Sequence, residues 1–298
     1  MSRYPLPLLI LGGLTVLLLI VGVLFFTADE PTPTTEPVSE ESTSTAEPQT
    51  EQRVIGGSVQ NRPIEAYRFG TGATEILYVG GVHGGYEWNS ILLAYEFIDY
   101  LETNLETIPD DLTISVIPNL NPDGLYTAAG LEGRFHASDI TDYRMHETGA
   151  GRFNANEVDL NRNFDCNWAP ESTWRGQVVS AGDEPFSEPE AQALREYVLD
   201  TNPVAAIFWH SRANAVYASE CNEGVLPATL SLLNTYASAA NYQAVPSFDA
   251  YPITGDMEGW LASLGIPAIT VELDTRTSTE WTQNRAGAIA VWELFTTD

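Results

Sequence analysis

From residue 53 onward, short apolar runs rich in branched residues alternate with longer amphipathic segments. The short runs predict buried strands, and the amphipathic segments predict helices. We expect strands over 75–79, 112–117, 204–209 and 268–273. We expect helices over 88–105, 188–199, 226–240, 256–264 and 280–295. This alternation predicts one α/β domain over 53–298, with a mostly parallel or mixed, twisted central sheet flanked by helices.

Two helix ends carry specific signals. Ser187 and Glu190 have the spacing of a capping box at the start of the second helix, and Gly265 suits the end of the fourth. Both support the boundaries expected from the apolar pattern.

The first part of the chain has a different pattern. Residues 6–28 are almost entirely apolar, and about 20 such residues are enough for a helix to cross a bilayer. Phe26 does not suit the cleavage site of a signal peptide, so we expect a transmembrane anchor or an uncleaved signal. Residues 29–52 are rich in Thr, Pro, Glu and Ser, which predicts a disordered linker.

The charges near this segment predict its orientation. Arg3 is the only early cation and acids begin at Asp29, so residues 1–5 are expected in the cytoplasm. Everything after residue 28 would then be membrane-anchored and extracytoplasmic, or secreted if the N-terminal segment is cleaved.

The chain is strongly acidic, with a formal net charge of -28, and all 13 of its basic residues are arginine. Such a surface repels polyanions, so we expect no nucleic-acid partner. The chain has two cysteines, Cys166 and Cys221, which are compatible with one disulfide or with two free thiols. The outward topology favours the disulfide.

Three separate segments supply candidate zinc ligands and their neighbours. His83 lies in the glycine-rich segment 81–87 together with Glu87, and His210 ends the apolar run that begins at Val204. Catalytic zinc takes three such ligands and leaves a fourth position open. His83, Glu87 and His210 would therefore suffice, although each alone has an ordinary structural interpretation.

Further polar residues lie in the same surroundings. Asn161 and Arg162 offer an amide beside a guanidinium, which suits a substrate carboxylate. The alternative is a local ion pair between Arg162 and Asp159. Glu272 lies in an apolar strand, where burial raises the pKa of a carboxyl group toward that of a general base. Its alternative is an internal salt bridge with Arg276 or Arg285.

The order and spacing of these segments resemble the zinc carboxypeptidase family typified by the pancreatic carboxypeptidases A and B. The matching segments span essentially all of 53–298, and they are 121–124, 158–164, 208–211, 251–260 and 269–273. The resemblance implies one Zn²⁺ per chain, held by His83, Glu87 and His210. It implies Glu272 as the general base.

The resemblance also implies roles in substrate binding. Asn161 and Arg162 would hold the terminal carboxylate, and Tyr251 would close over the substrate. Glu258 occupies the position of the pocket floor, where an acid favours a basic C-terminal residue. Glu258 could equally lie on the exposed face of the predicted helix.

Two points of the resemblance stay open in the sequence. The arginine that stabilises the oxyanion is expected to be Arg152, with Arg144 and then Arg134 as alternatives, because 128–151 is an insertion. The spacing from His83 to Glu87 is one residue longer than the family's usual motif, and the adjacent glycines could absorb it.

The sequence therefore predicts a monomeric, membrane-anchored zinc metallocarboxypeptidase. It would remove the C-terminal residue from extracytoplasmic peptides with a free carboxylate. One alternative is a murein peptidase of the same family that cuts γ-D-glutamyl-diamino acid bonds. Another is an inactive surface module that binds peptides.

Overall fold

The computed structural model describes residues 49–142, 144–248 and 252–296, all within one compact unit, Ala46–Asp298. The predicted membrane anchor at 6–28 and the predicted closing residue Tyr251 lie outside the described residues. No helix within the described ranges is long and apolar enough to cross a membrane.

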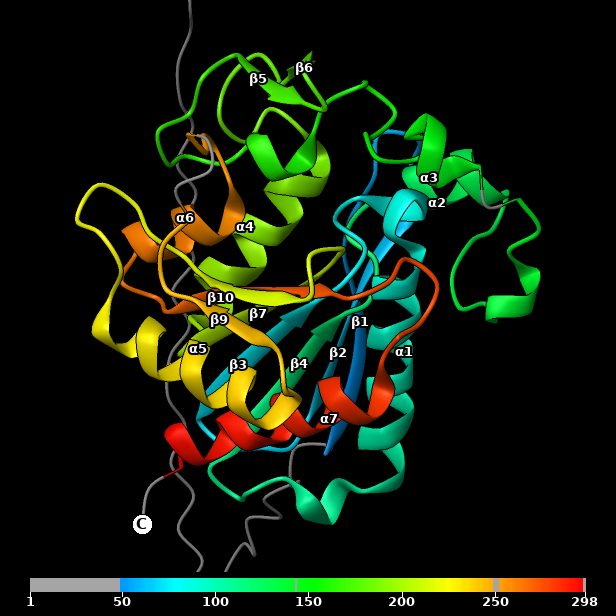
Figure 1. Cartoon of the computed structure of the whole chain (residues 1–298). Coiled ribbons are helices and arrows are strands. Elements are labelled where there is room, and N and C mark those ends of the chain that lie inside the picture. The colour runs from blue at the N-terminus through cyan, green and yellow to red at the C-terminus, as the bar shows by residue number, and fades with distance from the viewer. Residues whose placement is uncertain (1–48, 143, 249–251, 297–298) are drawn as a thin grey trace, which may run out of the picture. The chain divides into compact units, whose positions relative to one another are not determined.

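An eight-stranded mixed sheet forms the centre of the unit, in the order β1-β2-β4-β3-β7-β10-β8-β9 (Figure 1). The strands are β1 (Thr50–Gly57), β2 (Pro63–Phe69), β3 (Thr74–Val79), β4 (Leu112–Ile117), β7 (Ala205–Ser211), β8 (Ala215–Ala218), β9 (Gln243–Val245) and β10 (Ala268–Leu273). The central pairs β4-β3, β3-β7 and β7-β10 are parallel, whereas β1-β2, β2-β4 and β10-β8 are antiparallel. The mixed α/β sheet expected from the sequence is confirmed. A hairpin of β5 (Glu171–Trp174) and β6 (Gln177–Ser180) stands apart from the sheet.

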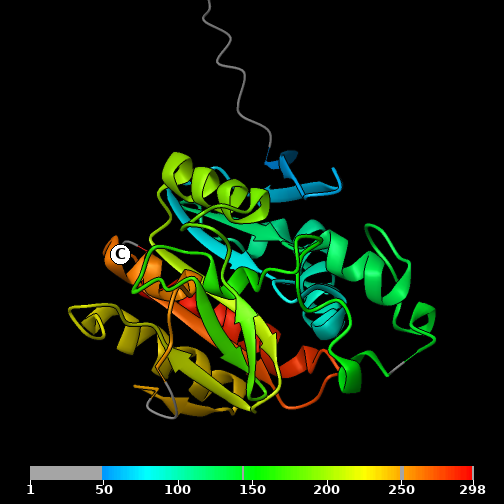
Figure 2. The same cartoon turned by 90° about the horizontal axis from the view of Figure 1, so that it is seen from above.

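Helices cover both faces of this sheet and form a separate core on each. The helices are α1 (Trp88–Thr103), α2 (Pro122–Ala129), α3 (Met145–Thr148), α4 (Pro189–Thr201), α5 (Pro227–Ala240), α6 (Met257–Ser263) and α7 (Trp281–Ala290). Residues of α1, α5 and α7 build one core, and residues of α4 and α6 build the other. In Figure 1, α4 and α6 lie above the sheet and α5 and α7 below it. Figure 2 shows α4 beside the blue edge strand β1, against which it packs.

The four strands expected from apolar runs are present because consecutive side chains face the two cores in turn. On β7, for example, Ile207 and Trp209 belong to one core, and Ala206 and Phe208 to the other. Both faces are therefore apolar, as a continuous hydrophobic run predicts.

Two details differ from expectation. β1 begins at Thr50, inside the stretch assigned to the linker, so the fold starts earlier than composition indicated. The capping box is wrong, because Glu188 is the N-cap of α4 and makes no capping bond through its side chain. The Glu190 carboxylate instead accepts from the backbone of Val59 and from Asn154. Gly265 follows the end of α6 with φ +79°, as expected of a helix-terminating glycine.

Candidate active site

The sheet brings three distant segments together at the carboxyl ends of its central strands. His83 follows β3, and His210 and Glu272 lie near the ends of β7 and β10. Because β7 and β10 are parallel and in register, His210 and Glu272 are direct neighbours across the pair. This is the edge at which α/β sheets bind their ligands.

The longer spacing between His83 and Glu87 is accommodated by a tight 3-10 turn over Gly84–Glu87. Gly84 has φ +45°, and a Cβ at this position would lie 2.7 Å from the carbonyl oxygen of Gly151. Only glycine fits this close approach without strain. The turn brings Glu87 Oε1 to 3.0 Å from His83 Nδ1, so the extra residue does not separate the two side chains.

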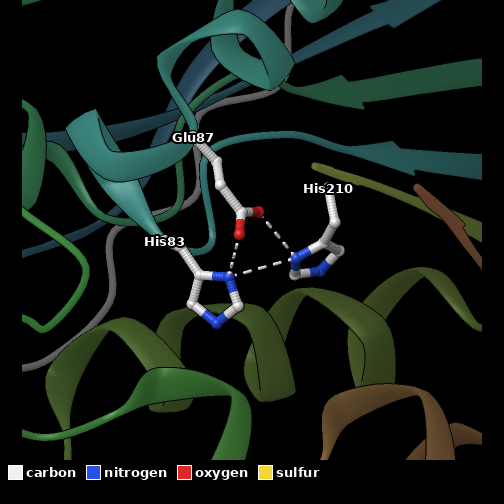
Figure 3. Close-up of side chains that lie close together, drawn as sticks. All are labelled: His83, Glu87 and His210. Atoms are coloured by element: carbon white, nitrogen blue, oxygen red, sulfur yellow. Dashed lines mark hydrogen bonds and ion pairs between the residues drawn. The ribbon is translucent and has the colours of Figure 1, made fainter. Parts of the chain in front are cut away.

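Three donor atoms converge in a buried cluster (Figure 3). His210 Nδ1 lies 3.2 Å from His83 Nδ1 and 3.1 Å from Glu87 Oε2. In a tetrahedral zinc site with bonds of roughly 2.1 Å, ligand atoms are about 3.4 Å apart, so this donor set fits Zn²⁺. His83, Glu87 and His210 form the one metal-type group found among the described residues.

Charges in the cluster favour ionised Glu87. Burial raises the pKa of this carboxyl group, but the rings of His83 and His210 more than offset it and hold the pKa well below its usual range. A carboxylate beside two imidazoles is the state that a divalent cation requires.

Carboxylates lie near the outer nitrogens of both histidines. His83 Nε2 lies 3.4 Å from Asp159 Oδ1, and His210 Nε2 lies 3.6 Å from Glu258 Oε1. Outer partners of this kind fix the orientation of metal-binding histidines. The sequence had offered Asp159 as a possible partner of Arg162, which was wrong: its side chain pairs with Arg152 instead.

The structure distinguishes between the three candidate arginines. Arg152 is buried, and its Nε and Nη2 donate to Asp159 Oδ2 at 3.2 and 2.7 Å. Its Nη1 lies 3.9 Å from Glu87 Oε1, facing the metal cluster. Arg144 is exposed and pairs with Asp142, and Arg134 pairs with Asp99. Arg152 alone of the three lies in the site.

Glu272 faces the pocket with its carboxyl group free of direct protein partners. Among the residues that the structure describes, none donates a hydrogen bond or forms an ion pair with it, so the alternative of an internal salt bridge is not observed. Burial and the negative charge of Glu87 raise its pKa to about 7. A carboxyl group with this pKa can both accept and return a proton near neutral pH.

A cavity of about 810 Å³ opens over these groups, and Asn161 and Arg162 line it. Asn161 Oδ1 accepts from the backbone of Met257 at 3.0 Å, which fixes its amide. Arg162 donates to the hydroxyl of Ser172, and within the described ranges it forms no ion pair. Both side chains are therefore placed to bind a substrate carboxylate, as expected. The positive charge of Arg162 is available to that ligand.

Two acids lie on the α6 side of the cavity. Glu258 is buried rather than exposed, contrary to one sequence interpretation, and accepts from Thr270 Oγ1 at 2.8 Å. Asp256 caps α6 by accepting from the backbone of Gly259 at 2.8 Å. Burial and the nearby Glu258 raise the pKa of Asp256 to about 7.

Cys166 and Cys221, which the sequence left between a bridge and free thiols, form a disulfide with a Cα–Cα distance of 6.1 Å. Both residues line the cavity. The bridge therefore joins two loops that form part of its wall.

Sequence reasoning missed other members of the site. Arg175, at the turn of the β5–β6 hairpin, and Arg212, after β7, both line the cavity. Arg276 had been considered only as a salt-bridge partner of Glu272, yet its Nη1 lies 3.8 Å from Glu87 Oε1. The signal that could have found all three was the scarcity of cations, because each arginine in so acidic a chain is a candidate for binding an anion.

Comparison with known proteins gives one consistent result. The zinc carboxypeptidase family model, peptidase M14, matches residues 40–293. A gamma-D-glutamyl-L-diamino acid endopeptidase of Lysinibacillus sphaericus is 25% identical over 253 residues, covering 78% of this chain and 63% of that protein. Murein peptide amidase A of Escherichia coli K12 is 33% identical over 149 residues, covering 47% of this chain and 58% of that protein.

Solved structures share the fold. A murein-tripeptide amidase of Escherichia coli O157 superposes with TM-score 0.57 at 24% identity, covering 84% of this chain and 94% of that one. Bovine thrombin-activatable fibrinolysis inhibitor, in complex with tick carboxypeptidase inhibitor, gives TM-score 0.62 at 18% identity, covering 83% and 88%. With a family match over residues 40–293 and a zinc-type donor set at the strand ends, the chain belongs to the zinc carboxypeptidases, a family of zinc-dependent peptidases.

Proposed function

We propose that this chain hydrolyses the bond between a γ-D-glutamyl group and a diamino acid in extracytoplasmic peptides. The observation that carries this proposal is the acid-lined side of the pocket, where Asp256 and Glu258 line the same cavity as Arg162. A diamino acid at the end of a peptide brings a carboxylate and a second, cationic amine. The carboxylate suits Arg162, and the amine suits the two acids.

Each residue of the site has its own role in the proposed reaction. Bound Zn²⁺ would polarise the scissile carbonyl and lower the pKa of water. Glu272 takes the proton from the attacking water and returns it to the leaving amine. Arg152, held by Asp159, presents Nη1 toward the negative charge that develops on the carbonyl oxygen.

Two of the relatives support this substrate. The names of two similar proteins refer to murein peptides and to γ-D-glutamyl-L-diamino acid bonds. A second candidate is removal of C-terminal Lys or Arg from ordinary α-linked peptides, because the same acids would accept either side chain. The difference lies in the acyl half of the substrate.

A pair of substrates distinguishes the two activities. The zinc-loaded chain is incubated with a γ-D-glutamyl-L-lysine peptide and with an α-linked peptide that ends in Lys, each as free acid and as C-terminal amide. Release of lysine from the γ-linked free acid, abolished by chelation, supports the proposal. Release from the α-linked peptide alone supports the second candidate, and release from neither refutes both.

We also infer that the catalytic unit works outside the cytoplasm. The apolar segment at 6–28 and the Cys166–Cys221 disulfide support this location. Labelling of an engineered cysteine at an exposed position such as Glu196 by a membrane-impermeant thiol reagent in intact cells tests it. Labelling only after lysis would contradict it.

A further inference from the structure

The arginines of this chain are unevenly distributed. All 13 basic residues are arginine in a chain of net charge -28, yet five of them line the active-site cavity. Arg152 forms an ion pair with Asp159, and Arg162 is the residue expected to bind the terminal carboxylate of the substrate. The other three, Arg175, Arg212 and Arg276, also line a second cavity of about 650 Å³. We call these three residues the arginine rim.

The rim opens on the side of the site away from the acids. The second cavity shares Tyr86 and Trp174 with the first, but neither Asp256 nor Glu258 lines it. The pocket therefore has an acidic part and a cationic part, with the first cavity extending over both. A substrate that fills this pocket meets opposite charges at its two ends.

Arg276 is held so that one nitrogen stays available. Its guanidinium carbon lies 4.1 Å from the centre of the Tyr86 ring, a cation–π contact that fixes its plane. Nη1 is buried and has no hydrogen-bond partner among the described residues, and its nearest carboxylate, on Glu87, is 3.8 Å away. Glu87 is committed to the two histidines, so a donor of Arg276 remains for a ligand.

Arg175 and Arg212 are positioned without carboxylate partners. Arg175 donates to the backbone carbonyls of His146 and Glu147 at 2.8 Å and to the Tyr86 hydroxyl at 3.1 Å. Arg212 is exposed and forms no ion pair with any described residue. Glu147 also lines the second cavity, but it contacts Arg175 through its backbone carbonyl. Neutral oxygens thus position the guanidinium group of Arg175, and no carboxylate among the described residues compensates the charge of either arginine.

Among the described residues, the three rim arginines form a single ion pair, the 3.8 Å contact of Arg276 with Glu87. Three cations with so little compensation, in a chain with a large excess of acids, indicate a site for an anion. The two cavities share Tyr86 and Arg276, and Arg276 lies beside Glu87. An anion at the rim would therefore lie next to the reacting carbonyl rather than next to the leaving amine. Arg162 and the two acids already serve the leaving residue. The anion must therefore belong to the acyl half of the substrate.

We propose that the arginine rim binds a carboxylate carried by the acyl half of the substrate, beside the bond that is cut. This inference rests on the proposed function and deepens it. When glutamate is linked through its γ-carboxyl group, its α-carboxylate stays free and lies a few bonds from the scissile carbonyl. In an α-linked peptide the corresponding carboxyl group is consumed in the chain. The rim would thus recognise the γ-linkage itself.

Two substrates that differ only in this carboxylate test the proposal. Both are γ-D-glutamyl-L-lysine peptides with free C-termini, one with a free α-carboxylate on the glutamyl residue and the other with an α-carboxamide. The zinc-loaded chain is expected to show a kcat/KM roughly 10- to 100-fold higher for the carboxylate, as fits charge-assisted hydrogen bonds. Arg276→Gln and Arg212→Gln are each expected to lower this ratio toward one.

Arg285→Gln is the matched control. Arg285 also lacks a carboxylate partner within the described residues, but it lies over Tyr100 and Trp281 on α7, away from both cavities. The ratio of the kcat/KM values for the two substrates should be the same in this variant as in the unmodified chain. Because the Arg212 side chain is exposed, its variant reports on the rim even if Arg276→Gln fails to fold.

Every outcome bears on the proposal. Equal cleavage of both substrates by the unmodified chain would overturn the rim's role while leaving the proposed function in place. A high ratio that survives both rim substitutions would overturn it as well. Failure to cleave either substrate would refute the proposed function, and the rim's role with it.

Discussion

The two sides of the pocket hold their charged groups in different ways. On the side of the strands and α6, His83, His210 and Arg152 each face a carboxylate oxygen at 3.6 Å or less. On the side of the rim, backbone oxygens and an aromatic ring hold Arg175. Arg276 packs over an aromatic ring. The first arrangement fixes groups for chemistry. The second keeps positive charge free for a ligand.

This comparison predicts that substitutions on the strand side act on turnover and metal, whereas substitutions on the rim act on selectivity. The largest expected effect is that of Glu272→Gln, which keeps the size of the side chain and removes its basicity. The value of kcat should fall by roughly 10²- to 10⁴-fold, the usual contribution of a general base. Zinc content, measured by atomic absorption, should stay at one per chain.

The control is Glu196→Gln, an exposed acid on α4 that touches neither cavity. It should leave kcat unchanged. Undiminished turnover in Glu272→Gln would remove this residue from the mechanism, and loss of zinc would assign it to the metal instead.

The disulfide is expected to stabilise the wall that it shares with the strand side. Replacing Cys166 and Cys221 together by Ser opens a loop of 55 residues, which in the chain-entropy model is worth about 4 kcal/mol of unfolding free energy. Urea unfolding monitored by tryptophan fluorescence measures this loss. An unchanged midpoint would mean that the bridge does not constrain the chain in solution.

Asp159→Asn tests whether one carboxylate orients both His83 and Arg152. The Asp159 pKa lies well below its usual range, because the charges of Arg152 and of His83 outweigh the effect of burial. Loss of this charge should weaken zinc binding about 10- to 100-fold, as is typical of outer contacts at metal sites. Competition with a chromophoric chelator measures the affinity.

Asp165→Asn is the matched control, since Asp165 is an exposed acid in the same segment. Equal zinc affinity in the two variants would show that Asp159 does not position His83.

The smallest expected change concerns pH and Asp256. Its folded pKa, about 7, lies above that of an unfolded aspartate, so the native state binds the extra proton between these values. Its contribution is therefore fully present below about pH 4 and is lost as the pH rises toward 7. Asp256→Asn keeps the helix cap and removes this dependence.

The measurement is the difference in Tm between variant and parent from pH 4 to 7. The Tm of the variant should increase relative to that of the parent as the pH rises. A constant difference would mean that Asp256 is ionised throughout this range.

The sequence predicted the strand side of the pocket well and the rim poorly, for a physical reason. Strands such as 112–117 and 268–273 are buried on both faces, so their apolar runs are continuous and their ends mark the site. His210 and Glu272 could be placed because they interrupt or end such runs. The rim residues lie on turns and loops, where only tertiary contacts such as the ring of Tyr86 determine position.

The hairpin of β5 and β6 illustrates the same difficulty. Its residues are mostly polar and exposed, without the alternation that predicts a half-buried strand. Trp174 and Arg175 reach the cavity only because the hairpin folds over it. The capping box at Ser187 failed for a related reason, because tertiary bonds to Asn154 and Val59 engage the Glu190 carboxylate.

The gathering of arginines around the cavity also determines how the protein responds to salt. At long range, the net charge of -28 on the whole chain repels an anionic substrate. At contact the same substrate meets five arginines. Since the screening length is about 8 Å at physiological ionic strength, added electrolyte weakens the distant repulsion before it weakens contacts inside the cavity. Capture of an anionic substrate should accordingly speed up as moderate salt is added, the reverse of the behaviour of enzymes that attract their substrates from a distance.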